Sequence, residues 1–484
     1  MILFSKKKAL SFKPCALRLA PYALRFKKAL RLAPYALSLL LFNNSVKAQS
    51  CLPDNSALKQ LVETKELKTA MVGVYVYDDS SKKEIADYQG DKYFVPASNT
   101  KLFSLYAGLK YLGDTLVGIQ YFENDTAVYI FPTGDPSLLH PDYQSQPVID
   151  FLKKTNKKIY LVDKGWKENA LGVGWAWDDY NEDYAIERSQ FPVYGNFIRW
   201  NQQNSATRSN QAFGPTATVS SSPEISWKVR FSTDSSSKTF LVQRLMDSNV
   251  FVIRPGTETN IIQDVPFITN NLQSAINLLP DTIGKRANSI NLINIKTLFS
   301  LPSVKLSGSV NSIYSRPADS VFIPMMHRSD NFFAEQTLLM VSNEQLGFMK
   351  DETIIDSLLT GPLADLPQKP SWVDGSGLSR FNLFSPRDFV AVLIKLKNEF
   401  GMDRMKKILP TGGNGTLKNY YRADSGYVFV KTGSLTGVLC LSGYIYTKNK
   451  HLLEFSILVN NHNGGSSAIR RAVESYVEYL RKNN

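Results

Sequence analysis

Three short segments, unequally spaced along the chain, constrain its fold more than any other feature. They are Ser98-Asn99-Thr100-Lys101, Ser329-Asp330-Asn331 and Lys431-Thr432-Gly433. About 230 residues separate the first two segments, whereas only about 100 separate the last two. A compact domain that contains all three segments needs far less chain between the first and the second, so the spacing predicts that a further region is inserted between them.

The first segment lies at the start of a predicted helix. Apolar residues follow it at helical spacing, namely Leu102, Phe103, Leu105, Tyr106, Leu109 and Leu112. This pattern places Ser98 in the first turn of a buried amphipathic helix. Residues three apart share a helix face, so we expect the Lys101 ammonium to reach the Ser98 hydroxyl. The spacing alone is weak support, because it recurs by chance at Ser56 and Lys59.

The residue types of the first two segments predict nucleophilic catalysis. A serine hydroxyl is a poor nucleophile until a base removes its proton. Lys101 can be that base for Ser98 if burial and nearby cations lower the pKa of its amine. Ser329 is then the expected proton relay to the leaving group, and Asn331 is expected to hold Lys101 and a substrate amide.

The third segment lies in a predicted β-strand over residues 427–433. The edge of such a strand can pair with an extended peptide, while Lys431 and Thr432, next to Gly433, bind its terminal carboxylate. The backbone N–H groups of Ser98 and Ser434 are the expected oxyanion hole.

Metal chemistry has little support in the sequence. The four histidines, at positions 140, 327, 451 and 462, form no His-Glu-x-x-His pattern and no pair at i, i+4. A metal hydrolase is therefore poorly supported. His327 and Arg328 are interpreted as a pair at a helix start on the wall of the cleft.

The positive charge of the chain is concentrated at its N-terminus. The formal charge is +13, but the first 48 residues hold ten Lys or Arg and no Asp or Glu, which leaves only +3 for the rest. Nucleic acid is therefore not an expected partner. Residues 16–24 repeat at 29–37, and residues 27–48 have the basic, apolar and small-residue parts of an export signal that ends at Ala48. We expect 1–48 to be a leader, the apolar stretch to be too short for a transmembrane anchor, and the protein to be exported to the bacterial periplasm or cell envelope.

Two cysteines remain after the leader. Cys440 lies in a predicted strand, where a buried free thiol is the usual outcome. Cys51 leaves two alternatives open, lipidation or a disulfide with Cys440.

The elements at the two ends of the chain predict one α/β domain. Residues 71–78, 438–447 and 452–460 are expected strands, and 466–482 an expected helix. We expect a catalytic domain of 49–119 plus 299–484, with an antiparallel sheet flanked by helices, and a mainly-β insertion at 120–298. The insertion holds Trp166, Trp175, Trp177, Trp200 and Trp227, for which core packing is favoured over stacking on sugars.

The three motifs and several further segments together give the chain a resemblance to a known protein family. They are Gly134-Asp135-Pro136-Ser137-Leu138, Gly174-Trp175-Ala176-Trp177-Asp178-Asp179, Asp374-Gly375-Ser376-Gly377-Leu378-Ser379-Arg380 and Lys431-Thr432-Gly433-Ser434-Leu435-Thr436-Gly437. With them the chain resembles the D-alanyl-D-alanine carboxypeptidase/endopeptidase family, the class C low-molecular-mass penicillin-binding proteins, over about residues 54–480. The family's fold is the β-lactamase/transpeptidase-like architecture.

The resemblance implies hydrolysis of peptidoglycan stem peptides through an acyl-enzyme on Ser98, with β-lactams as covalent inhibitors. It implies no metal and no organic cofactor. It also implies that the insertion recognises the third residue of the stem, for which Asp178 and Asp179 are candidates; a turn or capping role is the alternative. Arg380 either lines the cleft or makes a structural salt bridge. Two other functions stay open, a β-lactamase and a non-catalytic peptidoglycan-binding scaffold.

Overall fold

The computed structural model describes residues 56–204, 217–232, 237–258, 260–286, 289–301 and 310–484. The predicted leader and Cys51 lie outside these residues. In the part that is described, no helix is long and apolar enough to cross a membrane.

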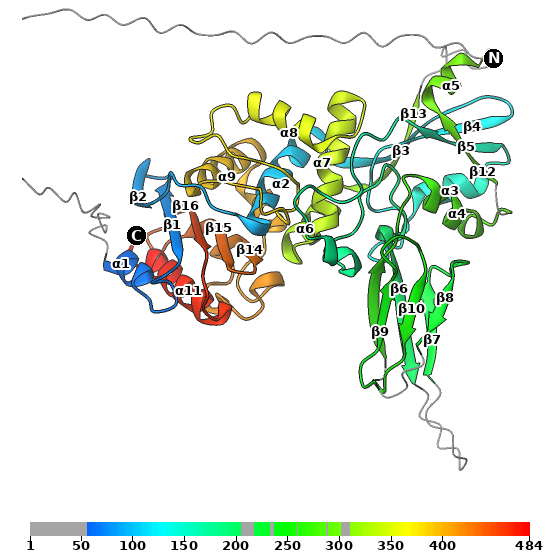
Figure 1. Cartoon of the computed structure of the whole chain (residues 1–484). Helices are drawn as coiled ribbons and strands as arrows, with labels where there is room; N and C mark the ends of the chain where they lie inside the picture. Colours follow the sequence, from blue (N-terminus) through cyan, green and yellow to red (C-terminus); the bar gives the residue numbers. More distant parts are fainter. Residues whose placement is uncertain (1–55, 205–216, 233–236, 259, 287–288, 302–309) are drawn as a thin grey trace, which may run out of the picture. The chain divides into compact units, whose positions relative to one another are not determined.

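A five-stranded antiparallel sheet joins the two ends of the described chain, in the order β14-β15-β16-β1-β2 (Figure 1). Its strands are β1 (Met71–Asp78), β2 (Lys83–Tyr88), β14 (Val428–Leu435), β15 (Val438–Tyr446) and β16 (Leu452–Asn460). The register pairs Met71 with Asn460 and Gly433 with Cys440. The predicted strands are confirmed to within two residues. Because β14 is an edge strand, one side of the Lys-Thr-Gly segment remains free to pair.

Helices cover both faces of this sheet. On one face, α11 (Ser466–Asn483) packs beside α1 (Ser56–Val62) and buries the predicted apolar stripe of Ile469, Val473, Val477 and Leu480. On the other face lies α9 (Pro386–Phe400), which begins with a capping box between Ser385 and Asp388. The capping box satisfies two backbone N–H groups that would otherwise be unpaired. The predicted class, an antiparallel sheet flanked by helices, is confirmed.

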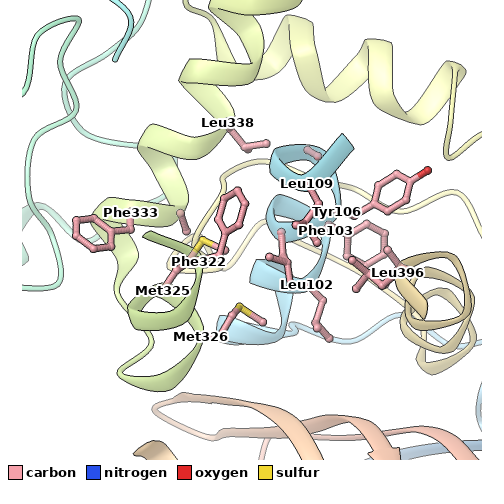
Figure 2. Close-up of a cluster of buried hydrophobic side chains, with 14 of the residues drawn as sticks. Leu102, Phe103, Tyr106, Leu109, Phe322, Met325, Met326, Phe333, Leu338 and Leu396 are labelled. Carbon is pink, nitrogen blue, oxygen red and sulfur yellow. The ribbon is translucent and has the colours of Figure 1, made fainter. Parts of the chain in front are cut away.

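The helix that follows Ser98 is buried on every side. Figure 2 shows Leu102, Phe103, Tyr106 and Leu109 of α2 (Lys101–Tyr111) packed among side chains of α6 (Asp319–His327), α7 (Asn331–Leu346) and α9. The prediction of an amphipathic helix was therefore wrong in one respect, because α2 has no solvent face from Lys101 to Leu109. The physical reason is its central position, between α7 and α9. Two further helices pack on this group, α8 (Asp351–Thr360) against α7 and α10 (Met402–Ile408) against α6 and α9.

The described residues between the first two motifs form three further sheets (Figure 1). One is five-stranded, in the order β12-β5-β4-β3-β13, and two are three-stranded, β8-β10-β9 and β11-β6-β7. The strands are β3 (Thr115–Glu123), β4 (Ala127–Pro132), β5 (Lys158–Asp163), β6 (Phe197–Asn204), β7 (Ala217–Ser222), β8 (Val229–Phe231), β9 (Leu241–Arg244), β10 (Phe251–Arg254), β11 (Ile261–Pro266), β12 (Ile290–Asn294) and β13 (Asn311–Pro317). The helices are α3 (Pro147–Lys154), α4 (Gln273–Thr282) and α5 (Ile295–Ser300).

Strand pairing bears on the limits of the inserted region, which were expected at 120 and 298. Strand β3 begins at Thr115, and β13, which pairs with it, ends at Pro317. We therefore propose limits near 115 and 317. β3 and β13 pair in one sheet although they are far apart in the sequence, and such a pairing cannot be predicted from the sequence alone. The pairing places both proposed limits outside the expected ones.

The tryptophans of the insertion differ in how far their side chains are buried. Trp200 is buried and Trp227 packs against the same core, as predicted. Trp177 is 72% exposed, so core packing was the wrong prediction for it. Cys440 is a buried free thiol, and burial raises its pKa to about 12.

Candidate active site

Ser98 lies in a 3-10 turn that opens directly into α2. The turn spans Ala97–Thr100, and its first residue has φ +48°, a conformation that non-glycine residues rarely adopt. Two glycines pack against it. A Cβ on Gly377 would lie 1.9 Å from the carbonyl oxygen of Ala97, and a Cβ on Gly433 would lie 2.6 Å from that of Pro96. Only glycine allows so close an approach, so these two residues help to fix the position of Ser98.

Lys101 contacts Ser98 from the first turn of α2. Its Nζ lies 3.0 Å from Ser98 Oγ and donates to Asn331 Oδ1 at 2.6 Å and to the carbonyl oxygen of Ser376 at 2.8 Å. The side chain is fully buried. Burial lowers the pKa of Lys101 to about 8, although nearby carboxylates, Asp374 first among them, oppose the shift. A neutral amine at this position can accept the Ser98 proton.

Ser329 and Lys431 form a second hydroxyl–amine pair in the site. Ser329 lies in the turn between α6 and α7 with φ +63°, in the left-handed region. Lys431 Nζ donates to Ser329 Oγ at 2.9 Å and to the Thr432 carbonyl oxygen at 2.6 Å. Burial and the charge of Lys101 lower the pKa of Lys431 well below its ordinary value. This pair can exchange a proton with a group bound in the cleft.

Asn331 is the first residue of α7. The helix start is fixed by Asp330, whose side chain accepts from the Phe333 N–H at 2.9 Å. Asn331 Nδ2 donates to the carbonyl oxygen of Tyr184, at 2.9 Å. The amide therefore ties Lys101 to a segment of the inserted region.

The edge strand β14 holds the remaining motif residues. Thr432 Oγ1 bonds Thr416 Oγ1 at 2.9 Å, and Ser434 Oγ accepts from Arg470 at 2.8 Å. Gly433 lies between them against the Ser98 turn, where its Cβ would also lie 3.1 Å from the Asn99 nitrogen. All three sequence motifs therefore meet at one place.

A cleft of about 640 Å³ opens over these residues. Its lining includes Asp178 and Asp179, from a 3-10 turn over Trp177–Asn181, and Arg380. Asp179 Oδ1 accepts from the Tyr184 hydroxyl at 3.0 Å, and Arg380 donates to the Thr436 carbonyl oxygen at 2.9 Å. Both aspartates lie in a turn and line the cleft, and their contact with the third residue of a stem peptide stays a prediction. Among the described residues, Arg380 bonds a backbone carbonyl oxygen and makes no ion pair with a carboxylate, so the salt-bridge alternative is not supported.

One expectation about the cleft wall was wrong. His327 is the last residue of α6 and Arg328 follows it, so the pair lies at a helix end and not at a helix start. The predicted helix boundary failed because the chain reverses between α6 and α7 at Ser329. Arg328 forms ion pairs with Asp330 and Asp142.

The structure adds contacts that the motifs did not predict. The Ser376 carbonyl oxygen lies in the Asp374-to-Arg380 segment, whose similarity to the family was visible, although a role for its backbone was not. Tyr184 and Thr416 carried no sequence signal. In the described part of the chain, no group of three or more His, Cys, Asp or Glu residues is arranged to hold a metal ion.

Fold and site together define a serine acyltransferase of the penicillin-recognising kind, with a large insertion between its first two motifs. The sequence profile of the D-Ala-D-Ala carboxypeptidase 3 (S13) family matches residues 54–482. The chain therefore belongs to this family, and it is a serine-type D-Ala-D-Ala carboxypeptidase.

Individual relatives agree with this assignment. The chain is 24% identical over 439 residues to the D-alanyl-D-alanine carboxypeptidase of Actinomadura sp. (strain R39), covering 84% of this chain and 80% of the relative. It is 23% identical over 445 residues to the D-alanyl-D-alanine carboxypeptidase DacB of Haemophilus influenzae, covering 81% and 86%. The crystal structure of penicillin-binding protein 4 from Haemophilus influenzae is similar in fold, with a TM-score of 0.66 at 21% identity, covering 88% of this chain and 99% of that one.

Proposed function

We propose that the chain hydrolyses peptidoglycan stem peptides through an acyl-enzyme on Ser98. The observation that carries the proposal is the 3.0 Å contact between Ser98 Oγ and the buried amine of Lys101, whose pKa is lowered to about 8. In the first step Lys101 Nζ takes the Ser98 proton while Oγ attacks the carbonyl carbon of the penultimate D-alanine. The backbone N–H groups of Ser98 and Ser434 stabilise the resulting oxyanion.

Collapse of this intermediate breaks the C–N bond. The leaving amine takes a proton from the Ser329 hydroxyl, and Lys431 Nζ, 2.9 Å away, returns one to Ser329. Water then attacks the ester carbonyl, and its proton passes through Ser329 to the neutral Lys431 Nζ. Ser98 Oγ leaves with the proton that Lys101 Nζ took in the first step, which gives the shortened peptide acid, free Ser98 and both lysines in their starting states. Lys431 and Thr432 bind the terminal carboxylate of the substrate from the edge of β14. A β-lactam acylates Ser98 in the same way and leaves slowly.

We further propose that Asp178, Asp179 and Arg380 bind the side chain of the third stem residue. A carboxylate and a guanidinium in one cleft suit a side chain that carries both an ammonium and a carboxylate. Asp179→Asn is then expected to lower kcat/KM for stem peptides with such a third residue at least tenfold. Acylation by benzylpenicillin, which lacks that side chain, is expected to change less than twofold. An equal loss with both ligands would contradict this assignment.

We propose that endopeptidase activity accompanies the carboxypeptidase activity. The cleft over Ser98 adjoins a second cavity that shares Tyr184, Ser329 and Asn331 with it. This leaves room for a leaving group larger than one D-alanine. Chromatography of products from a cross-linked dimer should show monomers with the wild type, whereas release of D-alanine alone would restrict the activity to carboxypeptidase.

The alternatives make different predictions in one assay, labelling with a fluorescent penicillin. We expect a stable adduct. Rapid turnover of penicillin without an adduct would indicate a β-lactamase, and neither adduct nor turnover would indicate a scaffold.

For location, we propose export directed by residues 27–48. Secretion of a reporter fused to residues 1–50 tests this, and a cytoplasmic reporter would refute it.

A further inference from the structure

Glu335 is a buried carboxylate on α7, one helical turn after Asn331. Residues four apart share a helix face, so Glu335 and Asn331 point toward the same side of α7. Glu335 is 1% exposed. A carboxylate removed from water to this degree is costly unless it is paired and hydrogen-bonded. Its partners therefore indicate what it does.

One oxygen of Glu335 holds the segment that contacts the catalytic lysine. Oε1 accepts from the Ser376 N–H at 2.7 Å, and the Ser376 carbonyl oxygen accepts from Lys101 Nζ at 2.8 Å. The segment runs directly along α7, since a Cβ on Gly375 would lie 2.6 Å from the Ala334 carbonyl oxygen. The position of one of the three acceptors around Lys101 thus depends on a hydrogen bond to Glu335.

The other oxygen of Glu335 faces Arg188, from the inserted region. Arg188 Nη1 lies 3.4 Å from Glu335 Oε2, and the same guanidinium pairs with Glu168 and Asp351. The Arg188 side chain is fully buried. Three carboxylates around one guanidinium exceed what it can neutralise, and burial raises the pKa of both Glu168 and Glu335 to about 7. Such an arrangement is not an efficient way to stabilise a fold, so a role in the site is the better explanation.

We propose that Glu335 is a positioning residue for acylation. Held by Arg188, its carboxylate fixes Ser376, so that the Ser376 carbonyl oxygen and Asn331 together aim the Lys101 amine at Ser98. The inference rests on the proposed function, in which Lys101 activates Ser98. It gives the inserted region a part in the chemistry, through Arg188, that is separate from binding of the stem peptide.

The test separates the acylation rate constant from the penicillin dissociation constant by stopped-flow fluorescence. Glu335→Gln keeps an acceptor for the Ser376 N–H, and we expect its rate constant to stay within threefold of wild type. Glu335→Leu has similar volume but no acceptor, and we expect at least a tenfold loss in the rate constant with the dissociation constant within twofold. Asp351→Asn is the matched control, because it removes the charge of another partner of Arg188 without touching Ser376; we expect wild-type kinetics.

Three results would overturn the inference while leaving the proposed function intact. They are a wild-type rate in Glu335→Leu, a Glu335→Gln variant as slow as Glu335→Leu, and an equal loss in Asp351→Asn. If Glu335→Leu does not fold, Glu335→Asp takes its place, because it keeps the charge but withdraws the acceptor by one methylene. We expect at least a fivefold loss with it, and a wild-type rate would refute the role. Failure of the wild type itself to acylate would instead refute the proposed function.

Discussion

The pKa of Lys101 predicts how acylation depends on pH. Burial places this pKa near 8, and a lowered lysine pKa means that the neutral amine predominates above that value. The general base must be neutral to accept the Ser98 proton, so acylation should rise with pH. At pH 7 about one tenth of Lys101 is neutral, at pH 8 about half and at pH 9 about nine tenths. The second-order acylation rate constant should therefore increase roughly tenfold from pH 7 to its plateau.

The assay is stopped-flow acylation by a fluorescent penicillin between pH 5.5 and 9.5, with circular dichroism at each pH to establish that the protein stays folded. Lys101→Arg is the first comparison. A guanidinium stays protonated throughout this range, so the variant should lose the rise together with nearly all of its activity.

If a neutral Lys431 were the base in place of Lys101, it would produce a similar rising limb, because the pKa of Lys431 is also lowered. Lys431→Arg separates the two lysines. It keeps a fixed positive charge at that position, so the variant should acylate more slowly. The rise of its acylation rate constant with pH should still have a midpoint at or below pH 8. A limb that disappears in Lys431→Arg would assign the titration to Lys431. A wild-type rate that is flat from pH 6 to 9 would refute the role of Lys101 as the base.

Two further substitutions test the packing that positions Ser98. Gly433→Ala would place a Cβ 2.6 Å from the Pro96 carbonyl oxygen. The resulting strain of about 1–3 kcal/mol should slow acylation about tenfold or more. A wild-type rate in the stopped-flow assay would contradict the close packing of β14 on the turn. Phe103→Ala removes a fully buried ring from α2 and should lower the free energy of unfolding by about 3–5 kcal/mol in denaturant titrations. Phe381→Ala, at a ring 59% exposed, is the matched control and should change it by no more than about 0.5 kcal/mol; equal losses in the two variants would refute the buried position of Phe103.

The sequence predicted the elements whose own residues decide their structure. Strand β16 is found at the predicted residues 452–460, and α11 ends one residue after the predicted 482. Both have strong patterns of burial, and a pattern of that kind is local information. The three motifs were likewise sufficient to predict that Ser98, Lys101, Ser329 and Lys431 meet, because their chemistry requires a common site.

The remaining features depend on contacts between distant segments. The full burial of α2 follows from its place between α7 and α9, which the apolar spacing of residues 102–112 does not encode. The pairing of β3 with β13, on which the proposed limits of the insertion rest, is also a contact between distant segments. Glu335 could not be predicted as part of the site, because a single glutamate in a helix carries no sequence signal. Its role is indicated only by its contacts with Ser376 and Arg188 in the structure.

The covalent intermediate on Ser98 is the central claim, and intact mass spectrometry after incubation with benzylpenicillin tests it most directly. The wild type should gain the mass of one penicilloyl group, and peptide mapping should place it on Ser98. Ser98→Ala should remain unmodified with an unchanged circular dichroism spectrum. A stable adduct on Ser98→Ala, or on any other residue of the wild type, would contradict the account.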